Sequence, residues 1–359
     1  RRAVRSYERL QRDGVQPRQH TRKQRPMERL LPDFIKNPEL VPLGVHSPDM
    51  PHALGAARKV LATHPDIEAI MVNADPFAAS LVGVRLARTT GLPLIQDFRD
   101  IWAPCKLRRP RRPLPWLALI DRLERTCFEA AAHVLINTEV SLRDYHEHYP
   151  DLPTELFSVL RNHFDAELVS HGQHEPFDRY TILHLGQFSR FRVVDPLVKA
   201  VAKLVEGGID RDALQVVSTG QYGDKSMELA EQLGVRALFS RVDPVSYHEV
   251  GALLAAADLP VMIAEPAADQ RIASKFYDYL GSKRPMLAIS DNPESASLLK
   301  QCDGSEQFGH ADIDAIAAFI GAQMKLGRQR EVERTMKGLR SREATEMLVE
   351  VLERVTVRK

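Results

Sequence analysis

Serine, lysine and aspartate side chains stand close together between two apolar runs of the sequence. Ser274 and Lys275 come after the run LPVMIA, and Asp278 comes one helical turn after Lys275. Serine is a common N-cap, so Ser274 predicts the start of a helix, whose free backbone N–H groups favour an anion such as a diphosphate. Lys275 adds a cation, and Asp278 is placed to accept hydrogen bonds from a ribose diol. The alternative is a capped core helix in which Lys275 and Asp278 form an ordinary helix pair.

Glycine and arginine residues follow a second apolar run, in the segment TILHLGQFSRFR. The run ends at Gly186, and Arg190 and Arg192 come next in a predicted loop. Glycine lets a ligand approach the backbone closely, and arginine binds phosphate oxygens in a bidentate way. The segment fits a phosphate-binding loop and, equally well, a strand-ending turn with two solvated arginines.

Three charged residues lie at the end of a third apolar run, in the segment LIQDFRDIW. Asp97, Arg99 and Asp100 fall at the carboxyl end of a predicted strand, which is the edge where parallel sheets bind ligands. Carboxylates there are suited to orienting sugar hydroxyls or to acting as a general base. The same spacing is also common in local salt-bridge networks.

The composition limits the class of protein that holds these residues. The chain has 359 residues, which suggests two domains, and its 44% hydrophobic and 27% charged residues are typical of a folded globular protein. No apolar run is long enough to predict a transmembrane helix. The three cysteines form no CxxC pair, which excludes a disulfide scaffold and a cysteine-rich zinc site. The histidines suggest no metal site either, and a reducing cytoplasm is the simplest setting.

The net charge of +1 hides two basic segments. The first thirty residues carry ten Arg or Lys against three acids, and Lys106–Arg112 carries five cations between Trp102 and Trp116. Two interpretations of Lys106–Arg112 stay open: contact with an anionic membrane surface, at about 1 kcal/mol per cation, or a solvated surface loop. No aromatic-rich motif accompanies the cations, so nucleic acid is not an expected partner.

Apolar runs alternate with amphipathic segments from about residue 52, which indicates parallel sheets covered by helices. The predicted fold class is α/β, with two doubly wound, Rossmann-like domains facing a cleft. We expect an N-terminal domain at 1–168, a second domain at 169–330 and a C-terminal helix at 331–359 that packs back toward the first domain. The polar segment Asp165–Asp178 is the best linker. The predicted strands are Ala69–Asn73, Leu94–Asp97, Val134–Ile136, Phe157–Leu160, Thr181–Leu185, Leu214–Ser218, Ala237–Phe239, Leu259–Ile263 and Met286–Ile289.

The first domain is expected to lack its opening strands. No strand with a tight glycine turn precedes residue 69, and position 1 is Arg rather than Met. We therefore expect that the natural chain starts earlier.

Five segments, in this order, resemble motifs of the retaining glycosyltransferases of the GT-B fold, specifically glycosyltransferase family 4. DFRDIW, from Asp97, is similar to DFRDLW, and the helix RLERTCFEAAAHVLINT, which contains Glu124, resembles the E…ad.vi stretch. RNHFD, from Arg161, is similar to PNGFD, and LGQFSRFR resembles the glycine–arginine donor loop. The most specific match is SKFYDYLGSKRPMLAI, which is similar to SKLYEYLAAGRPILA. The resemblance covers nearly the whole chain.

The resemblance implies sugar transfer from a nucleotide-sugar donor with retention at the anomeric carbon, and it implies no metal and no other cofactor. The second domain would bind the donor and the first the acceptor. Asp278 matches the second glutamate of the family's paired-glutamate motif and would hold the ribose, while Gln270 falls at the first. The implied donor-binding residues are Gly186, Arg190, Arg192, Gln270, Ser274, Lys275 and Asp278, and the implied catalytic region is Asp97, Arg99 and Asp100.

Four positions depart from the family pattern. Asp278 is one methylene shorter than the usual glutamate, and Gln270 lacks the charge of the first one. Arg99 stands where many relatives have a histidine, and His163 replaces a glycine.

The leading hypothesis is a retaining glycosyltransferase that acts on a glycan or lipid-linked acceptor in polysaccharide or glycoconjugate assembly. It would be cytoplasmic and peripheral to the inner face of the plasma membrane. A catalytically degenerate GT-B domain that serves as a binding or scaffold protein is the main alternative. A nucleotide-sugar epimerase is another, although the sequence offers no matching acid/base set.

Overall fold

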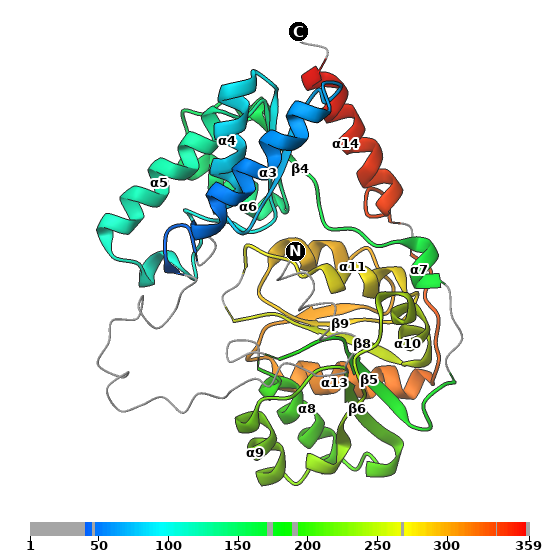
Figure 1. Ribbon diagram of the computed structural model, residues 1–359. Coiled ribbons are helices and arrows are strands. Elements are labelled where there is room, and N and C mark those ends of the chain that lie inside the picture. The colour runs from blue at the N-terminus through cyan, green and yellow to red at the C-terminus, as the bar shows by residue number, and fades with distance from the viewer. Residues whose placement is uncertain are drawn as a thin grey trace.

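Two parallel β-sheets build the protein, one in each of two lobes. The computed structural model describes residues 40–44, 47–170, 175–188, 193–266, 269–334 and 336–356. The sheets have four and six strands, and their lobes lie one above the other in Figure 1. The predicted α/β class with two helix-covered parallel sheets is therefore confirmed.

The first sheet has the simple strand order β1-β2-β3-β4, and all its pairings are parallel. Its second strand is buried at all five positions, as expected for an apolar strand covered on both faces. The strands are β1 (Ile70–Ala74), β2 (Leu94–Phe98), β3 (His133–Ile136) and β4 (Phe157–Val159), and the helices are α3 (Met50–Thr63), α4 (Ala78–Thr90), α5 (Leu114–Glu129) and α6 (Glu139–His148).

The second sheet is doubly wound, with the order β10-β9-β8-β5-β6-β7. Its strands are β5 (Tyr180–His184), β6 (Leu214–Ser218), β7 (Phe239–Arg241), β8 (Leu259–Ile263), β9 (Leu287–Ile289) and β10 (Glu306–Phe308). The chain direction across the sheet reverses between β5 and β8. Ligands of such sheets bind at this reversal, outside the carboxyl ends of the strands.

Apolar side chains on both faces of the second sheet are covered by helices. The helices α8 (Asp195–Glu206), α9 (Asp224–Gln232) and α13 (Ile313–Leu326) cover one face, and α10 (Val250–Ala256), α11 (Ser274–Gly281) and α12 (Pro293–Leu299) cover the other.

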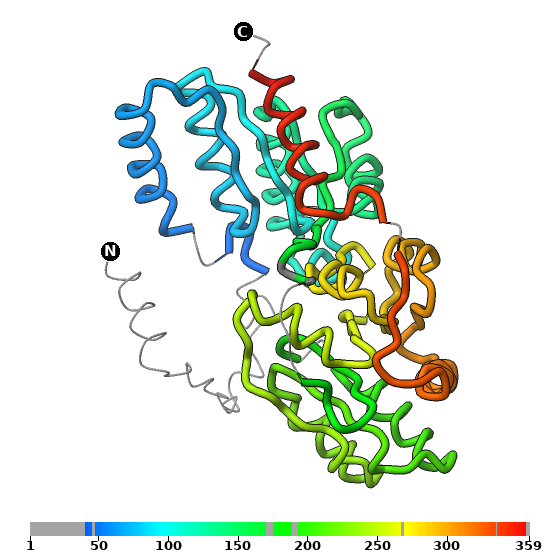
Figure 2. Tube along the Cα trace, turned by 90° about the vertical axis from the view of Figure 1, so that its right-hand side faces the viewer, coloured from blue at the N-terminus to red at the C-terminus, as the bar shows by residue number. Residues whose placement is uncertain are grey.

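The last helix, α14 (Ser341–Thr356), packs on the first sheet although the chain reaches it from the second lobe. Ala344 and Val351 of α14 bury Ile95, Leu135 and Leu160 on the sheet face turned away from α4 and α5. Figures 1 and 2 both show this red helix beside the upper lobe.

The chain crosses between the lobes twice. The outward crossing follows β4 and leads to the short helix α7 (Ala166–Ser170), and the return crossing precedes α14. Phe164 and Arg340 pair in an isolated parallel bridge where the two crossings meet.

The predicted strands agree with the structure to within about two residues, and the differences are local. Helix α3 and strand β10 were not predicted, and the predicted linker contains α7. The last helix, predicted to begin near residue 331, begins at Ser341. The reason is that Arg334 donates to the carbonyls of Tyr279 (2.9 Å) and Leu280 (2.6 Å), which ties the preceding segment to the end of α11.

Shortening Leu135 to alanine should destabilise the first lobe. Leu135 of β3 is fully buried beneath α14, so Leu135→Ala leaves a cavity that lowers the free energy of unfolding by about 2–5 kcal/mol. Urea denaturation measures the loss. Met347→Ala is the control, because Met347 lies on α14 but is 42% exposed, and it should change stability by less than about 0.5 kcal/mol. Equal losses for the two variants would contradict the packing of α14 on this sheet.

Candidate active site

Polar side chains gather at the carboxyl ends of the first sheet. Asp97 is the penultimate residue of β2, is 2% exposed, and accepts hydrogen bonds from Asn73 Nδ2 (3.2 Å) and Arg99 Nε (2.9 Å). Arg99 also donates to the carbonyl of Leu160 (2.8 Å). Burial raises the pKa of Asp97, although Arg99 and Asn73 act in the opposite direction. Asp97 therefore holds the Arg99 guanidinium in place.

A cavity of about 300 Å³ lies between the carboxyl ends of the two sheets. Both lobes contribute polar or charged side chains to its wall, as expected for a ligand site where two α/β sheets face each other. The first lobe supplies Arg99, Asp100, Asn137 and Asn162, and the second supplies Met262, Ala264, Glu265, Arg271, Ile272, Ala273 and Ser274.

An ion-pair chain crosses this cavity from one lobe to the other. Arg271 contacts Asp100 of the first lobe (3.2 Å) and Glu265 of its own lobe (3.1 Å). The three side chains are 19–35% exposed, and partly exposed pairs of this kind are worth at most about 1 kcal/mol each. A ligand that supplies its own charges or hydroxyls can therefore rearrange these three side chains at a small cost in free energy.

Two asparagines complete the first-lobe wall. Asn137, directly after β3, donates to the carbonyl of Arg99 (3.2 Å), and its Oδ1 accepts from the Asn162 N–H (3.0 Å). Asn162 in turn donates to the carbonyl of Ile272 in the second lobe (3.3 Å). The wall is thus connected across the lobes.

A buried carboxylate anchors the loop that carries Asp100. Glu124 of α5 is fully buried and accepts hydrogen bonds from the Ala103 N–H (3.1 Å) and from the hydroxyls of Tyr145 (3.0 Å) and Tyr149 (2.9 Å). Burial raises its pKa to about 7, against the effect of these three hydrogen bonds. Glu124, present in the family-like helix, is therefore a structural anchor of the loop.

Gly186 and Lys275 meet at the reversal point of the second sheet. Gly186 follows β5 with a φ of 97°, and its N–H donates to Thr219 Oγ1 (2.7 Å). Lys275, in the first turn of α11, extends over Gly186 so closely that a Cβ there would collide with its Nζ. The glycine thus makes room for a lysine ammonium at the end of β5.

Asp278 lies one turn further along α11. It is 7% exposed, and the Tyr247 hydroxyl donates to its Oδ1 at 3.4 Å. Burial raises its pKa to about 6, although the Tyr247 hydrogen bond and the charge of Lys275 lower it. The Asp278 carboxylate therefore feels the charge of Lys275 and accepts only a long hydrogen bond from Tyr247.

Two of the predicted donor residues take places that the sequence did not indicate. The N-cap of α11 is Ala273 rather than Ser274. Ser274 is instead the first residue of the helix; its side chain is exposed and lines the cavity. Gln270 does not line the cavity, because its side chain is bonded to the first lobe. Arg190 and Arg192 lie outside the described residues.

Arg271, Glu265, Asn137 and Asn162 line the cavity but were not singled out as site residues by the sequence. Asn137 directly follows β3 and Glu265 comes two residues after β8, so the strand-end rule that selected Asp97 would also have found them. Arg271 follows no strand, and only the fold brings it to Asp100.

The basic segment Lys106–Arg112 is not a loop of unpaired cations. Lys106 forms an ion pair with Asp269 (2.9 Å), and Arg109 pairs with Asp121 (2.8 Å). Arg108 donates to the carbonyl of Ile101 (2.7 Å), and Arg112 donates to that of Trp102 (3.1 Å). The buried Arg112 departs from a solvated loop, whereas Lys106 stays exposed, and carboxylates partly offset the charge of Lys106 and Arg109.

Within the described part of the chain, no three His, Cys, Asp or Glu side chains are grouped so that they could hold a metal ion. None of the helices in that same part has the length and apolar character needed to cross a membrane.

Placing alanine at Gly186 should cost stability. A left-handed φ disfavours any residue with a Cβ by about 1–2 kcal/mol, and the methyl group would also displace Lys275. Gly55→Ala is the matched control, because Gly55 lies within helix α3 with open space around it and alanine favours helix. Thermal unfolding should show a lower midpoint for Gly186→Ala and an equal or higher one for Gly55→Ala. An unchanged midpoint for Gly186→Ala would refute the strained position.

Comparison with known proteins finds similarity to sugar-transferring enzymes. The model of the glycosyl transferase 4-like domain matches residues 1–163. D-inositol 3-phosphate glycosyltransferase of Corynebacterium glutamicum (strain R) is 22% identical over 304 residues, which cover 78% of this chain and 72% of that protein.

Solved structures share the fold. A glycosyltransferase from Rickettsia africae superposes with a TM-score of 0.63 at 10% identity, covering 98% of this chain and 88% of that one. Anabaena HepE in complex with UDP and glucose gives a TM-score of 0.60 at 15% identity, covering 83% and 81%.

The motifs, the two facing sheets and these matches agree with one another. The chain carries a glycosyl transferase 4-like domain at residues 1–163 and is a distant homologue of the retaining glycosyltransferases of family 4.

Proposed function

We propose that this protein transfers a sugar from a nucleotide-diphosphate sugar to a hydroxyl of a glycan or lipid-linked acceptor, with retention of anomeric configuration. The observation that carries the proposal is the placement of Lys275 over Gly186, at the start of α11 and at the reversal point of the second sheet. A cation and the positive end of a helix dipole at that point suit a diphosphate.

The donor nucleotide would lie along α11. Lys275 would contact the diphosphate, and Asp278, one turn further, would accept hydrogen bonds from the ribose diol. The weak 3.4 Å contact with Tyr247 leaves the Asp278 carboxylate able to exchange that partner for a ribose hydroxyl. Solved structures of Anabaena HepE contain UDP and UDP-glucose, which supports a nucleotide sugar as the donor.

The chemical step would rest on stabilisation of the leaving group. Negative charge develops on the diphosphate as the bond to the sugar breaks, and the Lys275 ammonium and the N-terminus of α11 stabilise it because they are already in position. The acceptor hydroxyl attacks from the face that the diphosphate leaves, and its proton passes to the departing phosphate oxygen, so no protein nucleophile is required.

The acceptor would enter from the first-lobe side of the cavity. Arg99, Asp100, Asn137 and Asn162 face this space from the strand ends of that lobe. The Asp100–Arg271 pair crosses it, so an acceptor with hydroxyl groups would compete for the same hydrogen bonds. Polar, uncharged acceptors such as sugars or polyols match a wall with two cations and two carboxylates.

Nucleoside diphosphates should stabilise the protein through Lys275 and Asp278. At a concentration about a hundred times Kd, UDP, GDP, dTDP or ADP should raise the melting temperature by roughly 5 °C or more if it is the cognate nucleotide. Lys275→Ala and Asp278→Ala should remove the rise, because they delete the diphosphate and ribose contacts. Lys300→Ala, at an exposed position after α12, is the control and should keep it.

Two results would overturn this assignment. A shift that persists undiminished in both variants would place the nucleotide elsewhere. The absence of a shift with every nucleotide and with their sugars would favour a degenerate domain that binds other molecules.

Donor affinity should fall as the pH drops through 6. The pKa of Asp278 is raised to about 6 by burial, so the carboxylate that accepts from the ribose is present above this pH and is lost below it. Titration calorimetry with UDP-glucose between pH 5 and 8 is suitable, because a sugar-linked diphosphate does not itself titrate there. Asp278→Asn should bind more weakly at pH 8 and show no such fall; an identical pH profile for this variant would contradict the role of Asp278.

A further inference from the structure

Gln270 lies buried between the two lobes, and each of its polar side-chain atoms is bonded to the first lobe. Its Oε1 accepts from the Lys106 N–H (2.8 Å). Its Nε2 donates to the carbonyl of Pro104 (3.0 Å) and to Asp144 Oδ2 (2.5 Å). The residue is 4% exposed and comes from the second-lobe segment that leads into α11.

The backbone of Gln270 holds a second element of the first lobe. Its carbonyl accepts from Thr138 Oγ1 (2.9 Å) and from Ser141 Oγ (2.7 Å). Thr138 is the N-cap of α6 and accepts in turn from the Ser141 N–H (3.1 Å). One residue of the second lobe thus contacts both the loop after β2 and the start of α6.

We propose that Gln270 is a positioning residue that sets the two walls of the cavity in register. One residue along the chain is Arg271, which contacts Asp100 across the cavity, and five along is Lys275. Gln270 accepts a hydrogen bond from Lys106, in the loop that also carries Asp100. It also accepts one from Thr138, which directly follows Asn137. The inference rests on the proposed function in that these walls are those of the transferase site, and it gives Gln270 a role other than binding the donor.

The bonding pattern explains why this position holds an amide. Nε2 faces two acceptors, the Pro104 carbonyl and the Asp144 carboxylate, so a donor is required on that side. A glutamate would point an oxygen at both of them and would add a like charge beside Asp144. Lys106 pairs with Asp144 (3.3 Å) and Asp269 (2.9 Å), so its ammonium is already engaged with two carboxylates and would offset a third only in part.

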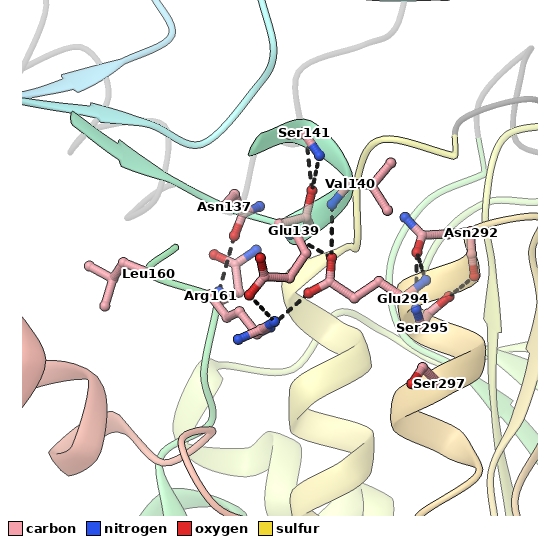
Figure 3. A network of polar contacts seen from close by, with 12 residues as sticks. Asn137, Glu139, Val140, Ser141, Leu160, Arg161, Asn292, Glu294, Ser295 and Ser297 are labelled. Atoms are coloured by element: carbon pink, nitrogen blue, oxygen red, sulfur yellow. Dashed lines mark hydrogen bonds and ion pairs between the residues drawn. The ribbon is translucent and has the colours of Figure 1, made fainter. Parts of the chain in front are cut away.

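A second contact supports the same region without duplicating it. Glu294 of α12 accepts from the Glu139 N–H (2.7 Å) and the Val140 N–H (3.4 Å), and Arg161 Nε donates to its other oxygen (2.7 Å), as Figure 3 shows. These contacts hold α6 and the outward crossing. Glu294 therefore holds the start of α6, whereas Gln270 also holds the loop after β2.

The test is a double-mutant cycle on Gln270 and Asp144. Gln270→Glu should lower kcat about ten- to a hundredfold and change the Kd of UDP less than about threefold, because the nucleotide contacts lie in the second lobe. Asp144→Asn alone should have a small effect, because an asparagine oxygen still accepts from Gln270. Adding Asp144→Asn to Gln270→Glu should restore about tenfold of the activity, since the new amide donates to the new carboxylate.

A readout independent of activity accompanies the cycle. Hydrogen–deuterium exchange should rise at residues 103–106 and 138–142 in Gln270→Glu and fall again in the double variant. Gln301→Glu is the matched control, because it adds the same charge at an exposed position and should alter neither readout. If Gln270→Glu does not fold, Gln270→Ala should give the same pattern of exchange without the added charge.

Three outcomes would overturn the inference: an unchanged exchange pattern, no rescue by Asp144→Asn, or a loss of UDP-glucose affinity with kcat retained. The last would return Gln270 to the donor site. If the wild-type protein binds no nucleotide and transfers no sugar, the proposed function fails, while the exchange data still decide the role of Gln270.

Discussion

The backbone N–H groups at the start of α6 need hydrogen-bond partners, and the opposite lobe provides a partner for two of them. A helix leaves its first four N–H groups without intrahelical partners. Glu294 accepts from the N–H groups of Glu139 and Val140 across the interface, and Thr138 accepts from that of Ser141 within its own lobe. A carboxylate at this position also interacts favourably with the helix dipole. These hydrogen bonds are among the contacts that fix α6 against the second lobe, next to the cavity.

The cavity combines groups that are held firmly with groups that are free to rearrange. Arg99 is fixed by the buried Asp97 and by a backbone carbonyl. Arg271, by contrast, is shared between two partly exposed carboxylates, Asp100 and Glu265. A site built in this way keeps part of its wall fixed, while another part can rearrange around a molecule that enters.

The sequence predicted the strands well because most of them contain a short apolar run, and the central ones, such as β2, are buried on both faces. The Gly186, Lys275 and Asp278 constellation was also predictable, since strand-end glycine and helix-start lysine are local signals. Helix starts were less certain, because serine favours an N-cap but Ala273 takes that position in α11.

Contacts between residues far apart in sequence lay beyond local rules. The partners of Gln270 are 126–166 residues away, and nothing in its own segment indicates them. The partners of Arg109 and Arg112, which are Asp121 and the Trp102 carbonyl, become their neighbours only when the loop folds back. Resemblance to a family located Gln270 in a motif, but only the fold shows what it touches.

The position of α14 has a consequence for how the protein is made. Helix α14 covers Ile95, Leu135 and Leu160 on one face of the first sheet. This face therefore stays exposed while the ribosome is still synthesising the second lobe. The first lobe therefore cannot complete its packing during synthesis until residues 341–356 have been made. An exposed apolar sheet face during that interval is a surface that chaperones recognise.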